Sequence, residues 1–494
     1  MKKIFKLLYC LPFSLLFSSC ESGFLEVSPS DQYSDSSVFV DIDGAQKVLT
    51  GAYDWMTNGW YAHYTNQYIL FMPDVMGDDS MVNSTGNYNR FVAPYQYSFT
   101  SNSTYSIDPW SGCYSMIDNC NAILDNLDNL PENNERNRIE GEALALRTYA
   151  YHFLIRSYAK PVNKHPESAG VILRLKSSVD DLPRSSVKEC YDQFVADIEK
   201  ACSLLANNSS SSKCYITEQG AHAIAARLYL DLGDYNKGVQ HAKVALEGLS
   251  LMSTADYKAN MCENNSETIW SFTCTSSDKQ SFLSLPAFWW YCDDNMTYVK
   301  SGYSSLGVTK QLIDMFDDAD IRKTLFVKVD GDYYKRNGSY VTSKICSRRN
   351  GDSDGSKGSG TVAFAEGEFN LIRGSEMYLI IAELAADNNH EEVALDALNT
   401  VRTARGLDEF NGTGEGLKTE IQNERRRELF AEGHRYFDIK RRNLPLDRTS
   451  IEEDWSRVGV IPAGSDKFEL PIPQDEIDAN GALTENDQNP QYRK

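Results

Sequence analysis

Residues 288–295, with the sequence FWWYCDDN, hold the side chains best suited to recognising a ligand. Four consecutive large aromatic rings cannot all enter one core from a loop, so we expect at least one to face solvent or a ligand. Flat rings stack on the apolar face of a sugar, and neighbouring carboxylates and amides bind its hydroxyl groups. The segment therefore predicts a sugar site, with the alternative that the rings fasten it to a scaffold. The candidates are Trp289, Trp290, Tyr291, Asp293, Asp294 and Asn295.

A second group of candidates also combines aromatic and polar side chains, and it lies nearer the N-terminus. Residues 71–110 are rich in Asn, Ser, Tyr and Pro, which is typical of a loop that carries function. The candidates there are Asp74, Asn87, Tyr88, Arg90 and Tyr95.

Motifs for catalysis and for metal binding are not found. The seven histidines include no HExxH pair, the cysteines lie at no zinc-finger spacing, and no Walker loop occurs. Residues 351–355, GDSDG, match the letters of GxSxG, but they lie in a Gly-rich run with no predicted strand before it and no helix after it, so they do not form a nucleophile elbow. Residues 350–355 resemble the start of a calcium loop, but Thr361 stands where a bidentate Glu is needed. We therefore expect no catalytic residue, metal or cofactor. A formal net charge of −21 also argues against nucleic acid as a partner.

The N-terminus reads as an export signal that ends in a lipidation site. Lys2, Lys3 and Lys6 precede an apolar run at residues 7–17, which is too short to span a bilayer. Cys20 follows two serines, as at a bacterial lipoprotein cleavage site. We predict a signal peptide over residues 1–19, a lipid such as palmitate on Cys20, and a tether over residues 20–43. A secretory signal with a chance cysteine is the alternative.

Helical periodicity dominates the rest of the chain, so we expect a mainly α fold with little β structure. Apolar residues at three- and four-residue spacing predict a helix buried on both faces that ends before Pro161. Residues 217–246 and 375–407 each predict a helical hairpin similar to a tetratricopeptide unit, although His222 replaces the usual Trp in the first. We expect one domain over residues 44–494, with loop-rich insertions at about 71–110 and 262–372.

Two further features have structural interpretations. Glu424 with Arg427, and Glu428 with Arg425, stand at i,i+3 spacing, which predicts an ion-paired helix rather than a basic patch. Nine of the eleven cysteines lie beyond Cys20, scattered through helical segments, and we expect most of them to be buried thiols.

Four segments and the lipidated start resemble the SusD/RagB family of outer-membrane lipoproteins. They are EALALRTYAY at 142–151, SEMYLIIAE at 375–383, NERRRELFAEGHRYFDIKR at 423–441 and LPIPQDEI at 470–477, the last followed by QNP at 488–490. The resemblance covers essentially the whole chain. It implies a tetratricopeptide-like scaffold of four helix pairs that holds a variable, loop-rich face.

The resemblance also implies a function that the motifs themselves do not carry. Members of the family are not enzymes, and they capture oligosaccharides at the cell surface for a SusC-like TonB-dependent transporter. Members of the RagB branch bind peptides, so a peptide is the alternative ligand. A scaffold that binds only proteins through its helical repeats, and a hydrolase, remain open as further alternatives. Family ligand residues occupy no fixed motif, so none is transferred by position.

Overall fold

The computed structural model describes residues 38–57, 65–208, 210, 212–259, 263–274, 288–289, 305–344 and 367–493. Within these ranges helices predominate and the strands are short, as the sequence predicts. Phe39 is already buried and α2 begins at Ile42, so the folded part starts before the predicted end of the tether. Among the described helices, none combines the length and the hydropathy that crossing a bilayer requires.

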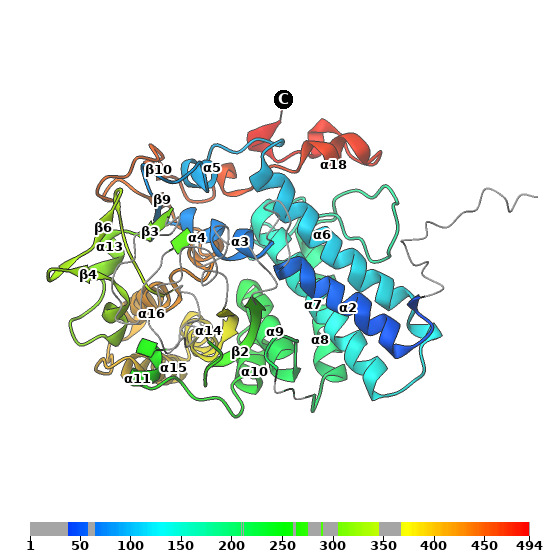
Figure 1. Cartoon of the computed structure of the whole chain (residues 1–494), viewed down its shortest axis with the longest axis horizontal. Coiled ribbons are helices and arrows are strands. Elements are labelled where there is room, and N and C mark those ends of the chain that lie inside the picture. Colours follow the sequence, from blue (N-terminus) through cyan, green and yellow to red (C-terminus); the bar gives the residue numbers. More distant parts are fainter. Residues whose placement is uncertain are drawn as a thin grey trace, which may run out of the picture.

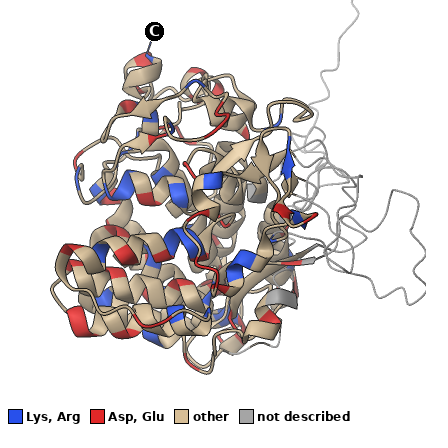
Figure 2. Ribbon diagram, turned by 90° about the vertical axis from the view of Figure 1, so that its left-hand side faces the viewer, with Lys and Arg blue, Asp and Glu red and all other residues tan. Residues whose placement is uncertain are grey.

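Antiparallel helices form the body of the molecule (Figure 1). One layer consists of α2 (Ile42–Thr57), α6 (Thr104–Asp125), α7 (Asn134–Tyr158) and α8 (Val187–Leu204), each packed on the next. The centre is formed by α9 (Glu218–Leu232), α10 (Tyr235–Ala245), α14 (Gly374–Asp387) and α15 (Glu391–Ala404). The chain continues through α16 (Gly414–Leu429), α17 (Arg435–Arg441) and α18 (Gln474–Ala479). Acidic and basic residues both lie on the helices that face the viewer in Figure 2.

The predicted hairpins are confirmed, together with the local signals that predicted them. Thr217 caps α9 by accepting a hydrogen bond from the backbone N–H of Gly220. Gly233 ends that helix at φ 72°, a left-handed conformation that glycine adopts without steric cost. Asn389 has φ 63° in the turn between α14 and α15. The long helix α7 is buried on both faces and ends at Tyr158, before Pro161.

Shorter elements connect and cover the helices. The described helical segments of this kind are α3 (Thr65–Leu70), α4 (Met72–Val75), α5 (Val92–Gln96), α11 (Thr254–Ala259) and α13 (Lys310–Ile313). A four-stranded antiparallel sheet has the order β1 (Ser80–Val82), β3 (Leu306–Val308), β7 (Ser339–Tyr340) and β6 (Lys335–Arg336). Two-stranded pairs are formed by β4 (Lys328–Val329) with β5 (Asp332–Tyr333), and by β9 (Leu446–Asp447) with β10 (Val460–Ile461).

Strand pairing connects the two segments that the sequence predicts as insertions. β2 (Thr268–Cys274) pairs antiparallel with β8 (Gly367–Arg373), in a register that joins Thr268 to Arg373 and Cys274 to Gly367. This ribbon therefore closes the base of the second insertion. β1 lies in the first insertion and pairs with β3 of the second, so the two insertions share one sheet. Residues 71–83 are all buried, which means that the first insertion is only in part a surface loop.

The charged motif on α16 lies in the interior. The predicted pair of Arg427 with Glu424 is present at 2.6 Å, but the predicted pair of Arg425 with Glu428 is wrong, because Arg425 binds Asp438 at 3.1 Å. Glu428 binds three other guanidinium groups, those of Arg322, Arg373 and Arg405. Burial alone would raise the pKa of Glu428, but these guanidinium groups hold it well below its usual range. Buried charges need partners of opposite charge. The charged residues of this motif therefore form ion pairs in the interior of the protein.

Candidate functional site

Most of the predicted aromatic segment lies outside the described residues. The candidates that lie outside the described residues are Trp290, Tyr291, Asp293, Asp294 and Asn295. The predicted lipidation site, Cys20, also lies outside the described residues. Phe288 and Trp289 are described, and both side chains are fully buried.

Trp289 is part of the core, which corrects its prediction as a ligand-binding residue. Its ring packs edge-to-face on Phe71 with centroids 5.8 Å apart, and Phe288 packs in the same way on Phe91 at 5.5 Å. The two insertions thus share one aromatic cluster. A large ring gains more from full burial against other rings than from exposure, and here the first insertion supplies the partners. The alternative that these rings fasten the segment to the scaffold holds for Trp289.

Two candidates of the first insertion are also interior residues. Asp74 is 1% exposed, and its Oδ2 accepts a hydrogen bond from the backbone N–H of Gly433 at 2.9 Å. Burial raises the pKa of Asp74 well above its usual value. Tyr95 is fully buried, donates to Asp454 Oδ1 at 2.6 Å and has the guanidinium of Arg448 over its ring. Both side chains hold the insertion in place, so their prediction as ligand contacts is corrected.

The other three candidates retain access to solvent. Tyr88 is 67% exposed and has φ 51°, while Asn87 and Arg90 are half-buried. Asn87 is occupied by its own loop: its Nδ2 donates to the carbonyl of Asn83 at 2.6 Å, and its Oδ1 accepts from the N–H of Asn89 at 2.8 Å. Tyr88 is thus the exposed ring of this group. The described structure does not bring it together with Trp289 at one surface, because Trp289 is buried.

A cavity of about 410 Å³ lies elsewhere, between the end of α2, strand β2 and the connection from α8 to α9. This volume falls within the range of small-molecule sites, roughly 300–1,000 Å³. The lining combines aromatic, polar and small or aliphatic side chains. The lining residues are Thr50, Gly51, Tyr53, Asp54, Met56, Cys214, Tyr215, Trp270, Ser271, Phe272, Thr273 and Leu371.

The aromatic side chains of the cavity are held in fixed positions. The rings of Tyr53 and Tyr215 meet edge-to-face with centroids 5.3 Å apart. The Tyr53 hydroxyl donates to Glu142 Oε2 at 2.8 Å and accepts from the N–H of Ile216 at 2.9 Å. Burial and the Glu142 carboxylate raise the pKa of Tyr53 well above its usual value, so this phenol stays protonated. A wall that is already ordered loses little entropy when a ligand binds.

The accessible surface of the cavity combines a ring with polar groups. Tyr215 is 36% exposed, whereas Trp270 is 1% exposed and forms part of the floor. Asp54 and Thr50 are exposed on α2 and place a carboxylate and a hydroxyl at the rim. Trp270 donates its indole N–H to the carbonyl of Cys214 at 3.3 Å, which ties the floor to the loop that carries Tyr215. The set offers stacking together with hydrogen-bond acceptors and donors.

Comparisons with known proteins identify the family. A family model described as starch-binding and associating with the outer membrane matches residues 23–230, and the model of the SusD family matches residues 325–492. The chain belongs to the SusD family. The resemblance stated from its four segments is thereby confirmed.

A relative of known sequence aligns with most of the chain, and two solved structures share its fold. A SusD-like protein of Bacteroides ovatus is 22% identical, with 88% of this chain and 82% of the relative aligned. A SusD-like carbohydrate binding protein of Bacteroides vulgatus has the same fold, with a TM-score of 0.79 at 24% identity, covering 92% of this chain and all of the other. A surface glycan-binding protein of Bacteroides thetaiotaomicron gives a TM-score of 0.72 at 20% identity, covering 92% of this chain and all of the other.

The SusD motifs of this chain lie in the helical scaffold, and none of their residues lines the cavity. The 142–151 segment lies in α7, 375–383 in α14, and 423–441 in α16 and α17. Sequence reasoning did not identify Tyr53, Tyr215 or Trp270 as site residues. For Tyr215 a signal was present, since this ring follows the polar run from Asn207 to Lys213 and no helical pattern accounts for it.

Proposed function

We propose that this SusD-family protein is a lipid-anchored surface protein that binds an oligosaccharide and delivers it to a SusC-like TonB-dependent transporter. The observation that carries the binding step is the preformed cavity with Tyr215 at its opening and Asp54 and Thr50 at its rim. An aromatic face beside hydrogen-bonding groups is the arrangement that a pyranose ring requires. Delivery and anchoring rest on the family and on the sequence around Cys20.

Binding at the cavity is tested by isothermal titration of the wild-type protein and of Tyr215→Ala. The glycan panel starts with malto-oligosaccharides, because the matching family is described as starch-binding. We expect Tyr215→Ala to weaken binding about tenfold, since losing an aromatic contact worth ~1.5 kcal/mol has that effect. Tyr88→Ala is the matched control, because it removes an exposed tyrosine from the first insertion.

Each other result of this titration points to a different conclusion. Weaker binding in Tyr88→Ala alone would move the site to the first insertion. Heat with peptides and none with glycans would favour the RagB-like alternative. Co-purification of a transporter without binding of any soluble ligand would favour a protein-interaction scaffold, and release of shorter products from a glycan would favour a hydrolase.

A further inference from the structure

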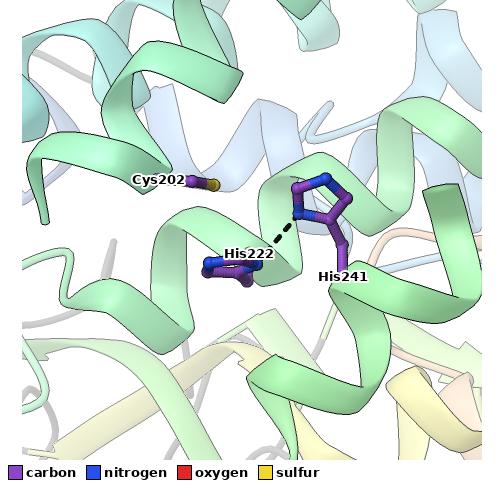
Figure 3. Close-up of side chains that lie close together, drawn as sticks. All are labelled: Cys202, His222 and His241. Carbon is purple, nitrogen blue, oxygen red and sulfur yellow. Dashed lines mark hydrogen bonds between the residues drawn. The ribbon is translucent and has the colours of Figure 1, made fainter. Parts of the chain in front are cut away.

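One cysteine and two histidines meet between three successive helices of the scaffold (Figure 3). Cys202 comes from α8, His222 from α9 and His241 from α10, and none of them lines the cavity. One possible metal ligand atom of each lies within 4.8 Å of those of the other two. Cys202 and His241 are buried, at 6% and 3% exposure, and His222 is half-buried.

The two imidazoles face each other through their Nδ1 atoms, which are 2.9 Å apart. Two nitrogens bound to one tetrahedral zinc ion, each at 2.0–2.1 Å, stand roughly 3.4 Å apart. Opening the pair by about half an ångström would therefore admit the ion. The Sγ atom of Cys202, on α8, lies within 4.8 Å of a ring nitrogen of each histidine. Rotation about the Cα–Cβ bond of a cysteine moves its sulfur between three staggered positions.

Glu199 supports His241 from the side opposite to this point. The Nε2 of His241 lies 3.4 Å from Glu199 Oε1, which also accepts hydrogen bonds from Lys237 at 2.9 Å and from the Tyr229 hydroxyl. A carboxylate that accepts the Nε2–H of a histidine leaves the lone pair on Nδ1, and this arrangement is the usual second shell of a metal-bound histidine.

We propose that Cys202, His222 and His241 bind a zinc ion, with water as the fourth ligand and Glu199 as a positioning residue for His241. Zinc favours this set of borderline and soft ligands in a tetrahedral site. The zinc–sulfur bond forms as the Cys202 S–H bond breaks, and that proton passes to solvent. The proton that lies between the two Nδ1 atoms moves from Nδ1 to Nε2 of His222, which frees both Nδ1 lone pairs for the ion, and no redox change occurs. Because the ligands come from α8, α9 and α10, the ion joins three consecutive helices and stabilises the scaffold.

The proposal is tested on the full mature chain, prepared without a histidine tag and stripped of metal with a chelator. We expect one equivalent of Zn²⁺ to bind with a dissociation constant in the micromolar range or tighter and to raise the melting temperature. Co²⁺ should give a thiolate-to-metal charge-transfer band in the near ultraviolet together with tetrahedral d–d bands. Cys202→Ser should abolish the charge-transfer band, and His222→Gln and His241→Gln should weaken Zn²⁺ binding at least tenfold.

Cys190→Ser is the matched control, because Cys190 is a buried thiol on the same helix and lies outside the cluster. This variant should keep both the cobalt band and the zinc affinity. Glu199→Gln should keep the band but lower the zinc affinity 10- to 100-fold, as second-shell changes do. Wild-type protein without a thiolate–cobalt band would overturn the proposal, even if the cysteine variant fails to fold. Zinc affinity unchanged in His222→Gln and His241→Gln would do the same.

Discussion

At the scale of single residues, burial decides what an aromatic or charged side chain does. Three side chains of the types found in sugar sites are nearly or fully buried and contact other side chains or the backbone of the protein. They are Trp289, Tyr95 and Asp74. Tyr215 has the same chemistry and is exposed at the opening of a cavity. A ring offers its face to a ligand only where the fold leaves that face uncovered, and residue type carries no information on this.

His152 shows the same effect on a titratable group. It is 2% exposed, and its Nε2 lies 2.7 Å from Asp231 Oδ2, which also accepts a hydrogen bond from the Tyr191 hydroxyl. Burial and the nearby Arg156 lower the pKa of His152 to about 4, even though Asp231 opposes the shift. The folded protein therefore holds this imidazole neutral at a pH where the unfolded chain already binds a proton.

This difference predicts acid sensitivity with a defined sign. Between about pH 6.5 and pH 4 the unfolded chain binds the extra proton, so the free energy of unfolding falls as the pH is lowered through this window. The loss from His152 alone approaches about 3 kcal/mol at pH 4. Urea denaturation at pH 7, 5.5 and 4.5 measures it. We expect His152→Gln to reduce the dependence of the free energy of unfolding on pH in this window. His165 is exposed, and we expect His165→Gln to leave that dependence unchanged. If the free energy of unfolding depended on pH equally in the wild type and in His152→Gln, His152 would not be the cause of the acid sensitivity.

At the scale of elements, the helices carry their own signals, whereas the packing between them depends on a few small residues. Gly238 lies at the contact of α10 with α14, where a Cβ atom would overlap the Leu384 side chain. Leu384 is itself buried, so it has little room to move away. The sequence predicts a small residue here because tetratricopeptide-like units pack their helices closely.

Gly238→Ala should therefore destabilise the protein although alanine favours helix formation. We expect a loss of about 1–3 kcal/mol in the free energy of unfolding, which is the usual cost of overpacking a core. Gly416→Ala on α16 is the matched control, because a Cβ there meets no other atom within 4 Å and should gain up to about 1 kcal/mol. Urea unfolding midpoints measure both, and a Gly238→Ala midpoint equal to or above that of the wild type would contradict this packing argument.

At the scale of the whole molecule, the two predicted insertions prove to be connected. β1 of the first insertion pairs with β3 of the second, and Phe71 contacts Trp289. The ribbon of β2 and β8 closes the second insertion and supplies the floor of the cavity through Trp270 and Phe272. The candidate site therefore lies where an insertion leaves the scaffold.

The proposed lipid on Cys20 predicts that the protein is held at a membrane. Cys20→Ala should move the protein from the membrane fraction to the soluble fraction, because it removes the proposed acyl chains, each buried methylene of which contributes ~0.8 kcal/mol to membrane binding. Cys10→Ala is the matched control, since this cysteine lies within the predicted signal and takes no lipid. Immunoblots of separated membrane and soluble fractions measure the change. Membrane retention of Cys20→Ala would contradict the lipid anchor.

The helical scaffold and the family could be predicted from the sequence alone. Periodic apolar residues, the Thr217 cap and the Gly233 turn act over a few neighbouring positions, and the 423–441 segment is specific enough to identify the fold. Local spacing also predicted the pair of Glu424 with Arg427. These features could be predicted because their partners lie within a few residues along the chain.

Contacts between residues that are far apart along the chain became known only from the folded structure. It gave Glu428 the partners Arg322, Arg373 and Arg405, and it buried Trp289 against Phe71. It also formed the cavity around Tyr215 and the cluster of Cys202, His222 and His241, whose members stand about twenty positions apart. Burial and ligand geometry are set by how helices pack, and no short-range spacing records that packing.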